Sequence, residues 1–302
     1  MSGTNLVNAN LLQRLEQLSV AAKSRIRGTM QGKRRSRGMG SSLDFADYRL
    51  YSPGDDIRQL DWNAYGRTGK PFIKLFLDEQ ELQVHVWVDA SKSMDFGGPS
   101  QDFDTPLNKF AYARQLAACI GYIALNRYDR LNAAAFTDAV TGKLPPLRGK
   151  GSAPRLFDFW SAAVPGGQGD IGAVFRHPAN LPKLPGMTWL LSDFLYSSGV
   201  EEALTYLLAA RQEVVVLHIL SPEEVDPSLS GELKLIDSES GSAKEVAMSG
   251  RVLQAYRSVL EQYTGSLQRF CYERGIAYIR CVTSIPPADL LQGQLRLAGV
   301  LR

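Results

Sequence analysis

Oxygen-bearing side chains follow two apolar runs of the sequence, in a pattern that suits a hard divalent cation. Asp89, Ser91 and Ser93 alternate at the end of the run VHVWV. Asp193 follows the later run MTWLLS. Mg²⁺ and Mn²⁺ take oxygen ligands, and Mg²⁺ usually keeps several waters. An ion held mainly by hydroxyls stays electrophilic and can accept a carboxylate from another protein, which is recognition without a bond being broken.

The same residues have a simpler interpretation. An Asp at the end of a strand often accepts hydrogen bonds within its loop or caps a helix, and a Ser does the same. Short motifs of this kind also occur by chance. Both interpretations, a metal site and a hydrogen-bonded loop, remain open from spacing alone.

A catalytic alternative is a phosphohydrolase that uses the strand-end Asp89 as its nucleophile. Such enzymes need a second acid two residues later for proton transfer, and Ser91 stands there instead. The sequence also contains neither a P-loop motif nor a GxSxG nucleophile elbow. We therefore favour a protein that is not an enzyme and takes no small-molecule substrate.

Composition is that of an ordinary globular protein of 302 residues, with 44% hydrophobic residues and a net charge of +3. The three cysteines lack CxxC spacing and the three histidines lie apart, so neither a disulfide framework nor a zinc site is expected. The sequence does not open with a signal peptide, and no apolar run is long enough to span a membrane. These features predict a cytoplasmic protein.

One basic segment, residues 23–37, favours a different kind of partner. Six cations in it, Arg25, Arg27, Lys33, Arg34, Arg35 and Arg37, could bind the phosphates of a nucleic acid. No aromatic residue lies between them to stack on bases. Nucleic-acid binding is therefore kept as an alternative to protein binding.

From residue 82 onward, apolar strands alternate with amphipathic helices. We expect strands over 83–89, 129–136, 187–194, 213–220 and 275–282, and helices over 108–126, 152–163, 201–212 and 251–274, with a short helix from 170. This alternation predicts a three-layer α/β sandwich with a mainly parallel sheet. Ligands of such sheets gather beyond the carboxyl ends of the strands, where Asp89 and Asp193 are expected to meet.

Two further parts complete the expected organisation. Residues 1–80 hold a helix from Asn10 to about Ala22, the basic segment and a stretch dense in turn residues, whereas residues 81–302 form the α/β domain. A polar Ser-Glu-Ser-Gly tip within residues 231–249 predicts a β-hairpin insertion.

Two resemblances to known families follow from these motifs. The runs FADYR, YSPGDDIR, DWN and RTGKP, in this order over 45–71, resemble the signature of the bacterial family called domain of unknown function 58. The Asp89-x-Ser91-x-Ser93 loop with Asp193 resembles the metal-ion-dependent adhesion site of von Willebrand factor A domains. The resemblance implies a von Willebrand A-like, Rossmann-type fold. It also implies an adaptor that partners a MoxR-type AAA+ ATPase in chaperone-like assembly or maturation of protein complexes.

The sequence departs from the adhesion-site pattern in the second loop. That pattern has a Thr ligand there, but the corresponding stretch, residues 165–170, reads PGGQGD. Gln168 and Asp170 are the further candidate ligands for Mg²⁺ or Mn²⁺, although Asp170 alternatively caps the helix that begins at Ile171.

The signature segment supplies a second candidate partner surface, formed by Asp55, Asp56, Arg58, Asp61, Trp62 and Arg67. Its acids could be a catalytic cluster. We favour a turn in which carboxylates cap backbone amides and pair with Arg58 or Arg67. Trp62 is expected to pack as an anchor against the α/β domain.

Overall fold

The computed structural model describes residues 6–22, 44–53, 55, 57–77, 81–98, 108–228, 231–236 and 243–302. The chain divides into two compact units: residues 1–22 together with 82–302, and residues 23–81. The expected boundary near residue 80 lies close to this division. The expected grouping of residues 1–80 differs from it, because the N-terminal segment belongs to the larger unit.

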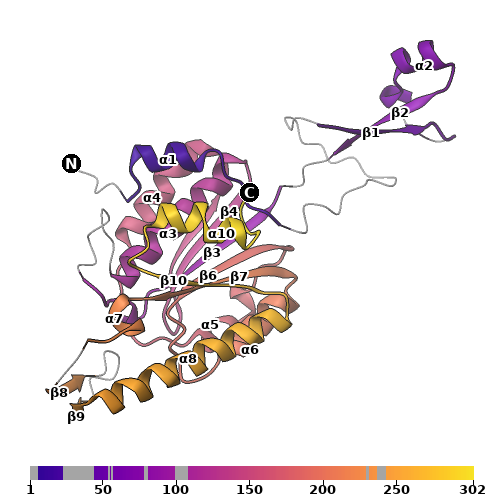
Figure 1. Ribbon diagram of the computed structural model, residues 1–302. Helices are drawn as coiled ribbons and strands as arrows, with labels where there is room; N and C mark the ends of the chain where they lie inside the picture. The colour runs from indigo at the N-terminus through magenta and orange to yellow at the C-terminus, as the bar shows by residue number, and fades with distance from the viewer. Residues whose placement is uncertain are drawn as a thin grey trace. The chain divides into compact units, whose positions relative to one another are not determined.

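A six-stranded sheet forms the centre of the larger unit (Figure 1). Its strands lie in the order β10 (Ala277–Val282), β7 (Gln212–Leu220), β6 (Gly186–Ser192), β3 (Gln83–Asp89), β4 (Arg130–Phe136) and β5 (Val140–Leu147). All neighbours are parallel except β4 and β5. The sheet is mainly parallel, as the alternation of elements predicts.

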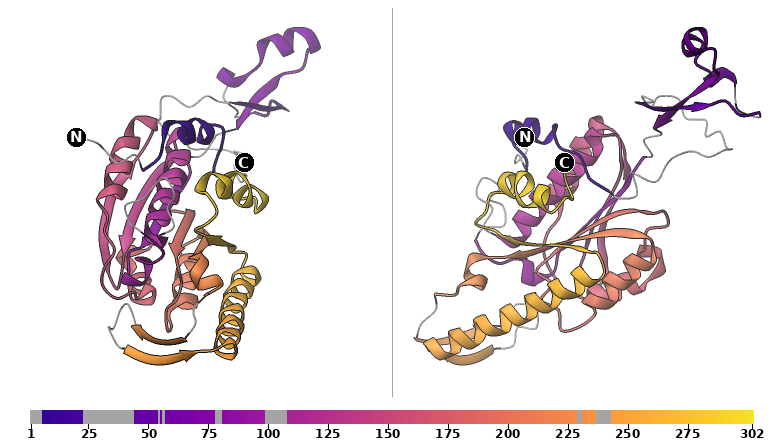
Figure 2. Two further views of the ribbon diagram at one scale, coloured as in Figure 1. Left: turned by 60° about the vertical axis from the view of Figure 1, so that its left-hand side comes forward. Right: turned by 45° about the vertical axis from the view of Figure 1, so that its right-hand side comes forward.

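Helices cover both faces of the sheet, so the unit has three layers (Figure 2). One face packs against α1 (Ala9–Leu15), α3 (Lys109–Asn126), α4 (Ala153–Ala162), α9 (Pro287–Gln292) and α10 (Gln294–Leu297). The other packs against α5 (Ile171–Arg176), α6 (Val200–Ala209) and α8 (Gly250–Glu273). Because both faces are covered, the strands are apolar along almost their whole length.

The N-terminal segment is held in the larger unit at two places. Leu15 in α1 is fully buried in the core that α3 also lines. Beyond α1, Ser19 exchanges two backbone hydrogen bonds of 2.9 Å with Arg302, and Val20 forms an antiparallel bridge with Leu301. The apolar stripe that predicts this helix is therefore buried by the α/β core.

Two expectations for the larger unit need adjustment. The N-terminal helix ends at Leu15, earlier than the predicted Ala22, since the chain then turns to pair with the C-terminal residues. Strand β5 has no counterpart among the predicted elements. Its Pro145 and Pro146 disfavour a central strand, but an edge strand tolerates proline because it has an unpaired side.

The predicted hairpin insertion is confirmed. A short helix, α7 (Pro222–Val225), leads toward β8 (Gly231–Ile236), which pairs antiparallel with β9 (Ala243–Met248) before α8 begins. Figure 1 shows this hairpin beside the start of α8. Among the residues that the structure describes, no helix has the length and apolarity to cross a bilayer.

The smaller unit is a β-hairpin with a helix between its strands. Strands β1 (Asp44–Leu50) and β2 (Phe72–Leu77) are antiparallel, and α2 (Trp62–Thr68) is flanked by a 3₁₀ turn, Ile57–Gln59. Gly69 ends α2 in the left-handed conformation at φ 66°, which a glycine adopts without strain. Its described core is small, with Ile73 and Ala64 buried.

Leu15→Ala tests whether the N-terminal helix belongs to the α/β core. We expect the free energy of unfolding of the larger unit to fall by about 2–5 kcal/mol, because a fully buried leucine leaves a cavity. Denaturant unfolding followed by the fluorescence of the buried Trp160 and Trp189 measures this loss. Gln13→Ala, on the exposed side of the same helix, is the control and should change little. Equal stability of the two variants would contradict the assignment.

Candidate functional site

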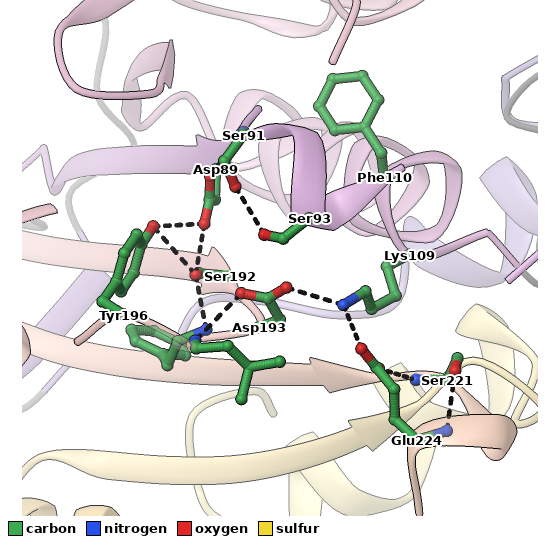
Figure 3. Close-up of polar contacts among 12 residues, drawn as sticks. Asp89, Ser91, Ser93, Lys109, Phe110, Ser192, Asp193, Tyr196, Ser221 and Glu224 are labelled. Atoms are coloured by element: carbon green, nitrogen blue, oxygen red, sulfur yellow. Dashed lines mark hydrogen bonds and ion pairs between the residues drawn. The ribbon is translucent and has the colours of Figure 1, made fainter. Parts of the chain in front are cut away.

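Strands β3 and β6 are neighbours in the sheet and bring their polar ends together. Val88 pairs with Leu191, so the next residues, Asp89 and Ser192, lie side by side at the carboxyl edge. Asp193 follows at once. Figure 3 shows Asp89 and Asp193 with their polar partners at this edge. The structure thus brings together the two carboxylates that the sequence analysis singles out.

Asp89 is fully buried and accepts three hydrogen bonds. Its Oδ1 accepts from the Ser91 amide at 2.8 Å, and its Oδ2 accepts from the Ser192 hydroxyl at 2.7 Å and from the Tyr196 hydroxyl. Burial, and then the nearby Asp193 charge, raise the pKa of Asp89 to about 6 in spite of these donors. The carboxylate is ionised at neutral pH and held by three donors.

Asp193 is neutralised by a buried lysine. Lys109, the first residue of α3, donates to Asp193 Oδ2 at 2.7 Å and to Glu224 Oε1 at 2.6 Å. Burial lowers the pKa of Lys109, but the two carboxylates outweigh it and hold the pKa above its usual value. The ammonium group is 1% exposed and keeps its charge. This Lys109–Asp193–Glu224 ion cluster joins the edge of the sheet to α3 and α7.

Glu224 is positioned by a capping box at the start of α7. The Ser221 hydroxyl accepts from the Glu224 amide, while Glu224 Oε2 accepts from the Ser221 amide at 2.8 Å. Its second oxygen, Oε1, is then free to face Lys109. The Tyr256 hydroxyl of α8 donates to the Glu224 carbonyl at 2.9 Å, so α8 is tied to the same cluster.

The other predicted ligands differ in their contacts and in their exposure. Ser91 and Ser93 contact each other, with 3.0 Å between their hydroxyl oxygens. Gln168 is exposed, and Asp170 caps α5 by accepting from the Ala173 amide at 2.9 Å. Between them, a Cβ on Gly169 would lie 2.7 Å from the Tyr196 ring and 3.0 Å from Ser91 Cβ. A threonine in this position is therefore excluded by the tyrosine that bonds to Asp89.

This arrangement does not fit a divalent cation. Every carboxylate oxygen of Asp89 and Asp193 already accepts a hydrogen bond, since Asp193 Oδ1 accepts from the Leu195 amide at 3.2 Å. The Lys109 ammonium already supplies positive charge at Asp193. In the described part of the chain, no three His, Cys, Asp or Glu side chains gather as a metal-holding group. A cation at Asp193 would be repelled by the Lys109 ammonium and would compete with these donors for the carboxylate oxygens.

Around the buried oxygens lies a rim of exposed side chains from three loops. Lys92 and Phe96 follow β3, Val164 follows α4, and Leu195 follows β6; all four are exposed. The first two of these loops are joined by backbone hydrogen bonds, from Lys92 to Gly167 at 3.0 Å and from Gly166 to Ala90 at 2.8 Å. We call Lys92, Phe96, Val164 and Leu195 the rim.

The signature residues of the smaller unit are mainly structural. Asp55 accepts from the Ser52 amide at 2.8 Å and pairs with Arg49 at 2.9 Å, so the turn forms as expected but with a different arginine. Asp61 is buried and caps α2 through the amides of Asn63 and Ala64, and it also accepts from the Tyr48 hydroxyl.

Other signature residues lie on the surface of that unit. Trp62 is 66% exposed and meets Tyr65 edge to face within its own unit, so its packing as an anchor against the α/β domain stays a prediction. Arg58 and Arg67 are exposed. Asp56 and the basic segment 23–37 lie outside the described residues.

Four residues of the site were not predicted: Lys109, Ser192, Tyr196 and Glu224. Lys109 is one of two cations in α3, a helix that is buried along almost its whole length. A cation in such a helix needs a partner of opposite charge. Ser221-Pro-Glu-Glu224 has the spacing of a capping box. Tyr196 has no comparable signal, since its role depends on where the loop after β6 folds.

Asp89→Asn should remove a pH dependence of stability. In the unfolded chain Asp89 ionises near 3.8, but in the folded protein it holds its proton up to about pH 6. The folded state binds more protons over this interval, so the free energy of unfolding falls as pH rises from about 4 to 6. Over this interval the free energy of unfolding of wild type should fall by on the order of 2–3 kcal/mol, whereas that of Asp89→Asn should not.

Denaturant unfolding at half-unit pH steps measures this difference. Asp158→Asn, an exposed carboxylate of α4, is the control and should keep the wild-type slope. Parallel curves for wild type and Asp89→Asn would show that the burial of Asp89 does not shift its pKa.

The lack of fit to a metal ion predicts an unfolding temperature that does not depend on Mg²⁺ or Mn²⁺. A bound ion at about a hundred times its dissociation constant adds about 2.7 kcal/mol to the folded state. Thermal unfolding of wild type and Asp89→Asn over a titration of either ion should show no such rise. A rise in wild type that Asp89→Asn abolishes would establish a metal site at this edge.

Comparisons with solved structures find distant similarity. The hypothetical protein BatB from Bacteroides thetaiotaomicron is 14% identical, with a TM-score of 0.43 over 72% of this chain and 98% of that one. An aerotolerance-related membrane protein from Bacteroides fragilis is 16% identical, with a TM-score of 0.42 over 72% and 99%. These scores are too low to carry an argument about function.

Sequence comparisons are more specific. An uncharacterised protein of Mycobacterium tuberculosis, Rv1480, is 28% identical over 237 residues, which is 78% of this chain and 73% of the relative. Mb1516 of Mycobacterium bovis, also uncharacterised, matches over the same shares. The family model described as "Protein of unknown function DUF58" matches residues 47–263, which include most of the signature segment and the strand-end site. The chain belongs to the DUF58 family.

Proposed function

We propose that this protein is a non-catalytic, protein-binding adaptor that uses the carboxyl edge of its sheet to bind a partner. One observation carries the proposal: the polar groups of the edge are buried and bonded to one another, while the side chains around them are exposed. In a site built in this way, the buried groups fix the shape and the exposed side chains are accessible to a partner. It holds no free nucleophile beside a free base.

The geometry argues against the phosphohydrolase alternative. A nucleophilic Asp89 would need an oxygen that a substrate can reach, but the residue is fully buried and accepts three hydrogen bonds. The general acid would have to be Ser91, whose hydroxyl contacts Ser93. Neither group is arranged for an in-line attack on phosphorus.

The rim has the chemistry of a protein interface. Phe96 and Leu195 are each 47% exposed, and each residue lies next to a member of the ion cluster. The Lys109 ammonium is 5.8 Å from the centre of the Phe96 ring, and the Leu195 amide donates to Asp193. Because the buried cluster holds these loops in place, the rim can bind with little loss of conformational entropy.

The site works, in this proposal, without a resident metal ion. The adhesion sites that the DxSxS pattern resembles recruit a partner carboxylate through a cation. Here the positive charge beside Asp193 is the buried ammonium group of Lys109, which also bonds to Glu224. Recognition therefore depends on the exposed rim and not on a coordinate bond.

The smaller unit offers a second surface of similar character. Trp62, Tyr65 and Ile57 are exposed there, and aromatic side chains are enriched at the centres of protein interfaces. With a contact surface on each of its two units, the chain suits the role of an adaptor between two proteins.

The partner we propose is a MoxR-type AAA+ ATPase in the cytoplasm, acting in the assembly or maturation of protein complexes. The support is the resemblance of the signature segment and the loop at Asp89 to families with that association. The adaptor itself has no P-loop motif, so ATP hydrolysis would belong to the partner.

Leu195→Asp should weaken binding to the MoxR-type ATPase of the same genome by at least about tenfold, because it places an unpaired carboxylate in an apolar contact. Biolayer interferometry with the two purified proteins measures the affinity. Leu184→Asp is the matched control: Leu184 is 55% exposed and precedes β6, at the opposite edge of the sheet.

Three results would overturn this function. The first is no binding of the ATPase by wild type, and the second is equal weakening by both substitutions. The third is turnover of a phosphate monoester by wild type that Asp89→Asn abolishes, which would establish the phosphohydrolase alternative. Salt-sensitive DNA binding that is lost when Arg34, Arg35 and Arg37 become Ala would favour a nucleic-acid partner instead.

A further inference from the structure

A pocket of about 190 Å³ lies on the face of the sheet that packs against α5, α6 and α8. It is lined by strands β3, β4 and β5 and by residues 179–183, which follow α5. On β3, its lining residue His85 is four positions before Asp89. The pocket is therefore separate from the edge described above.

The floor of the pocket is polar where the rest of this sheet face is apolar. His85 on β3 and Asn132 on β4 are direct partners in the parallel register. Two residues further along, their strands place Trp87 and Ala134 in the apolar core of the same face. An imidazole and an amide thus lie side by side on a surface where burial favours hydrocarbon.

The side chains of His85 and Asn132 lack a hydrogen-bond partner within the described part of the protein, whereas the polar side chain beside them on β6 has one. Thr188 on β6 pairs with His85 on its other side, and its hydroxyl donates to Gln212 Oε1 at 3.0 Å. Neither the His85 imidazole nor the Asn132 side-chain amide has a hydrogen bond to any described residue. Both side chains are half-buried and line the pocket, so their bonding capacity is available to a ligand that enters it.

The charge around the pocket is entirely positive. Lys143, on β5 opposite Ala134, and Lys183 both line it, and no Asp or Glu is among its described lining residues. Burial, and then the charge of Lys143, lower the pKa of His85 to about 4, so the imidazole is neutral at pH 7 and still donates one N–H. Two cations without a carboxylate beside them, together with the N–H donors of His85 and Asn132, suit an anion.

We propose that this pocket binds a small organic oxyanion, with its carboxylate or phosphate held by Lys143, Lys183, His85 and Asn132. The indole of Trp87 and the methyl group of Ala134 provide the apolar wall for the rest of the molecule. The pocket is smaller than the roughly 300–1,000 Å³ of drug-sized ligand sites, so the ligand is the size of a single-ring metabolite.

The test is an NMR titration of the full chain with inorganic phosphate and, separately, with benzoate, at constant ionic strength. Trp87→Phe assigns the indole N–H signal of Trp87, which lies in the pocket wall. We expect this signal to shift with saturation in at least one titration. The head group of the tighter probe distinguishes a phosphate ligand from a carboxylate ligand.

Charge removal decides whether the shift reports this pocket. Lys143→Gln with Lys183→Gln should weaken binding at least about tenfold, since two charge-assisted contacts are lost. Both lysines are exposed, so the variant should fold, and its thermal unfolding confirms this. Lys70→Gln with Arg155→Gln removes the same charge elsewhere and should bind as wild type does. No saturable shift with either probe, or equal weakening in the two double variants, would overturn the proposal.

Discussion

Two acidic side chains at the ends of adjacent strands have to be kept in an interior without water, and the edge of the sheet is built around this constraint. A buried carboxylate is stable only when charge or hydrogen bonds replace its hydration. Asp89 receives three donors, and Asp193 receives an ammonium group and an amide. The donors come from the loop after β3, from the end of β6 and the loop that follows it, and from α3, so satisfying the acids also positions those elements.

The largest consequence falls on α3 and α7. Lys109 is the first residue of α3, and Glu224 lies in the first turn of α7, so one ammonium group fixes both helix starts against β6. The hydrogen bond from Tyr256 to Glu224 then extends the contact to α8. A cluster of this kind adds specificity more than net stability, because desolvation offsets much of the attraction between the charges.

The sequence predicts those parts of the fold that depend on local pattern. Strand and helix positions follow from apolar periodicity, and the convergence of Asp89 and Asp193 follows from the parallel sheet rule. Strand β5 escapes because its two prolines argue against a strand unless its edge position is known. The hairpin of the smaller unit is hidden among turn residues that equally fit an irregular loop.

The site was less predictable than the fold, for a physical reason. Lys109 bonds to residues 84 and 115 positions away, and no local pattern encodes such a distance. From the sequence, Asp170 could be a metal ligand or a helix cap. Only the structure shows that it caps α5. Tyr196 also depends on the fold: its ring fills the space beside Gly169 in the second loop, and its hydroxyl donates to Asp89.

The pairing of residues 19–21 with residues 300–302 has a consequence for biosynthesis. Translation makes the N-terminal helix long before its pairing partner, so the bridge between Val20 and Leu301 can form only after the residues between them have been translated. In the sequence, the smaller unit lies between the two parts of the larger one, and it can fold on its own contacts during that time. The contact between residues 19–21 and 300–302 is therefore a late step in completing the core of the larger unit.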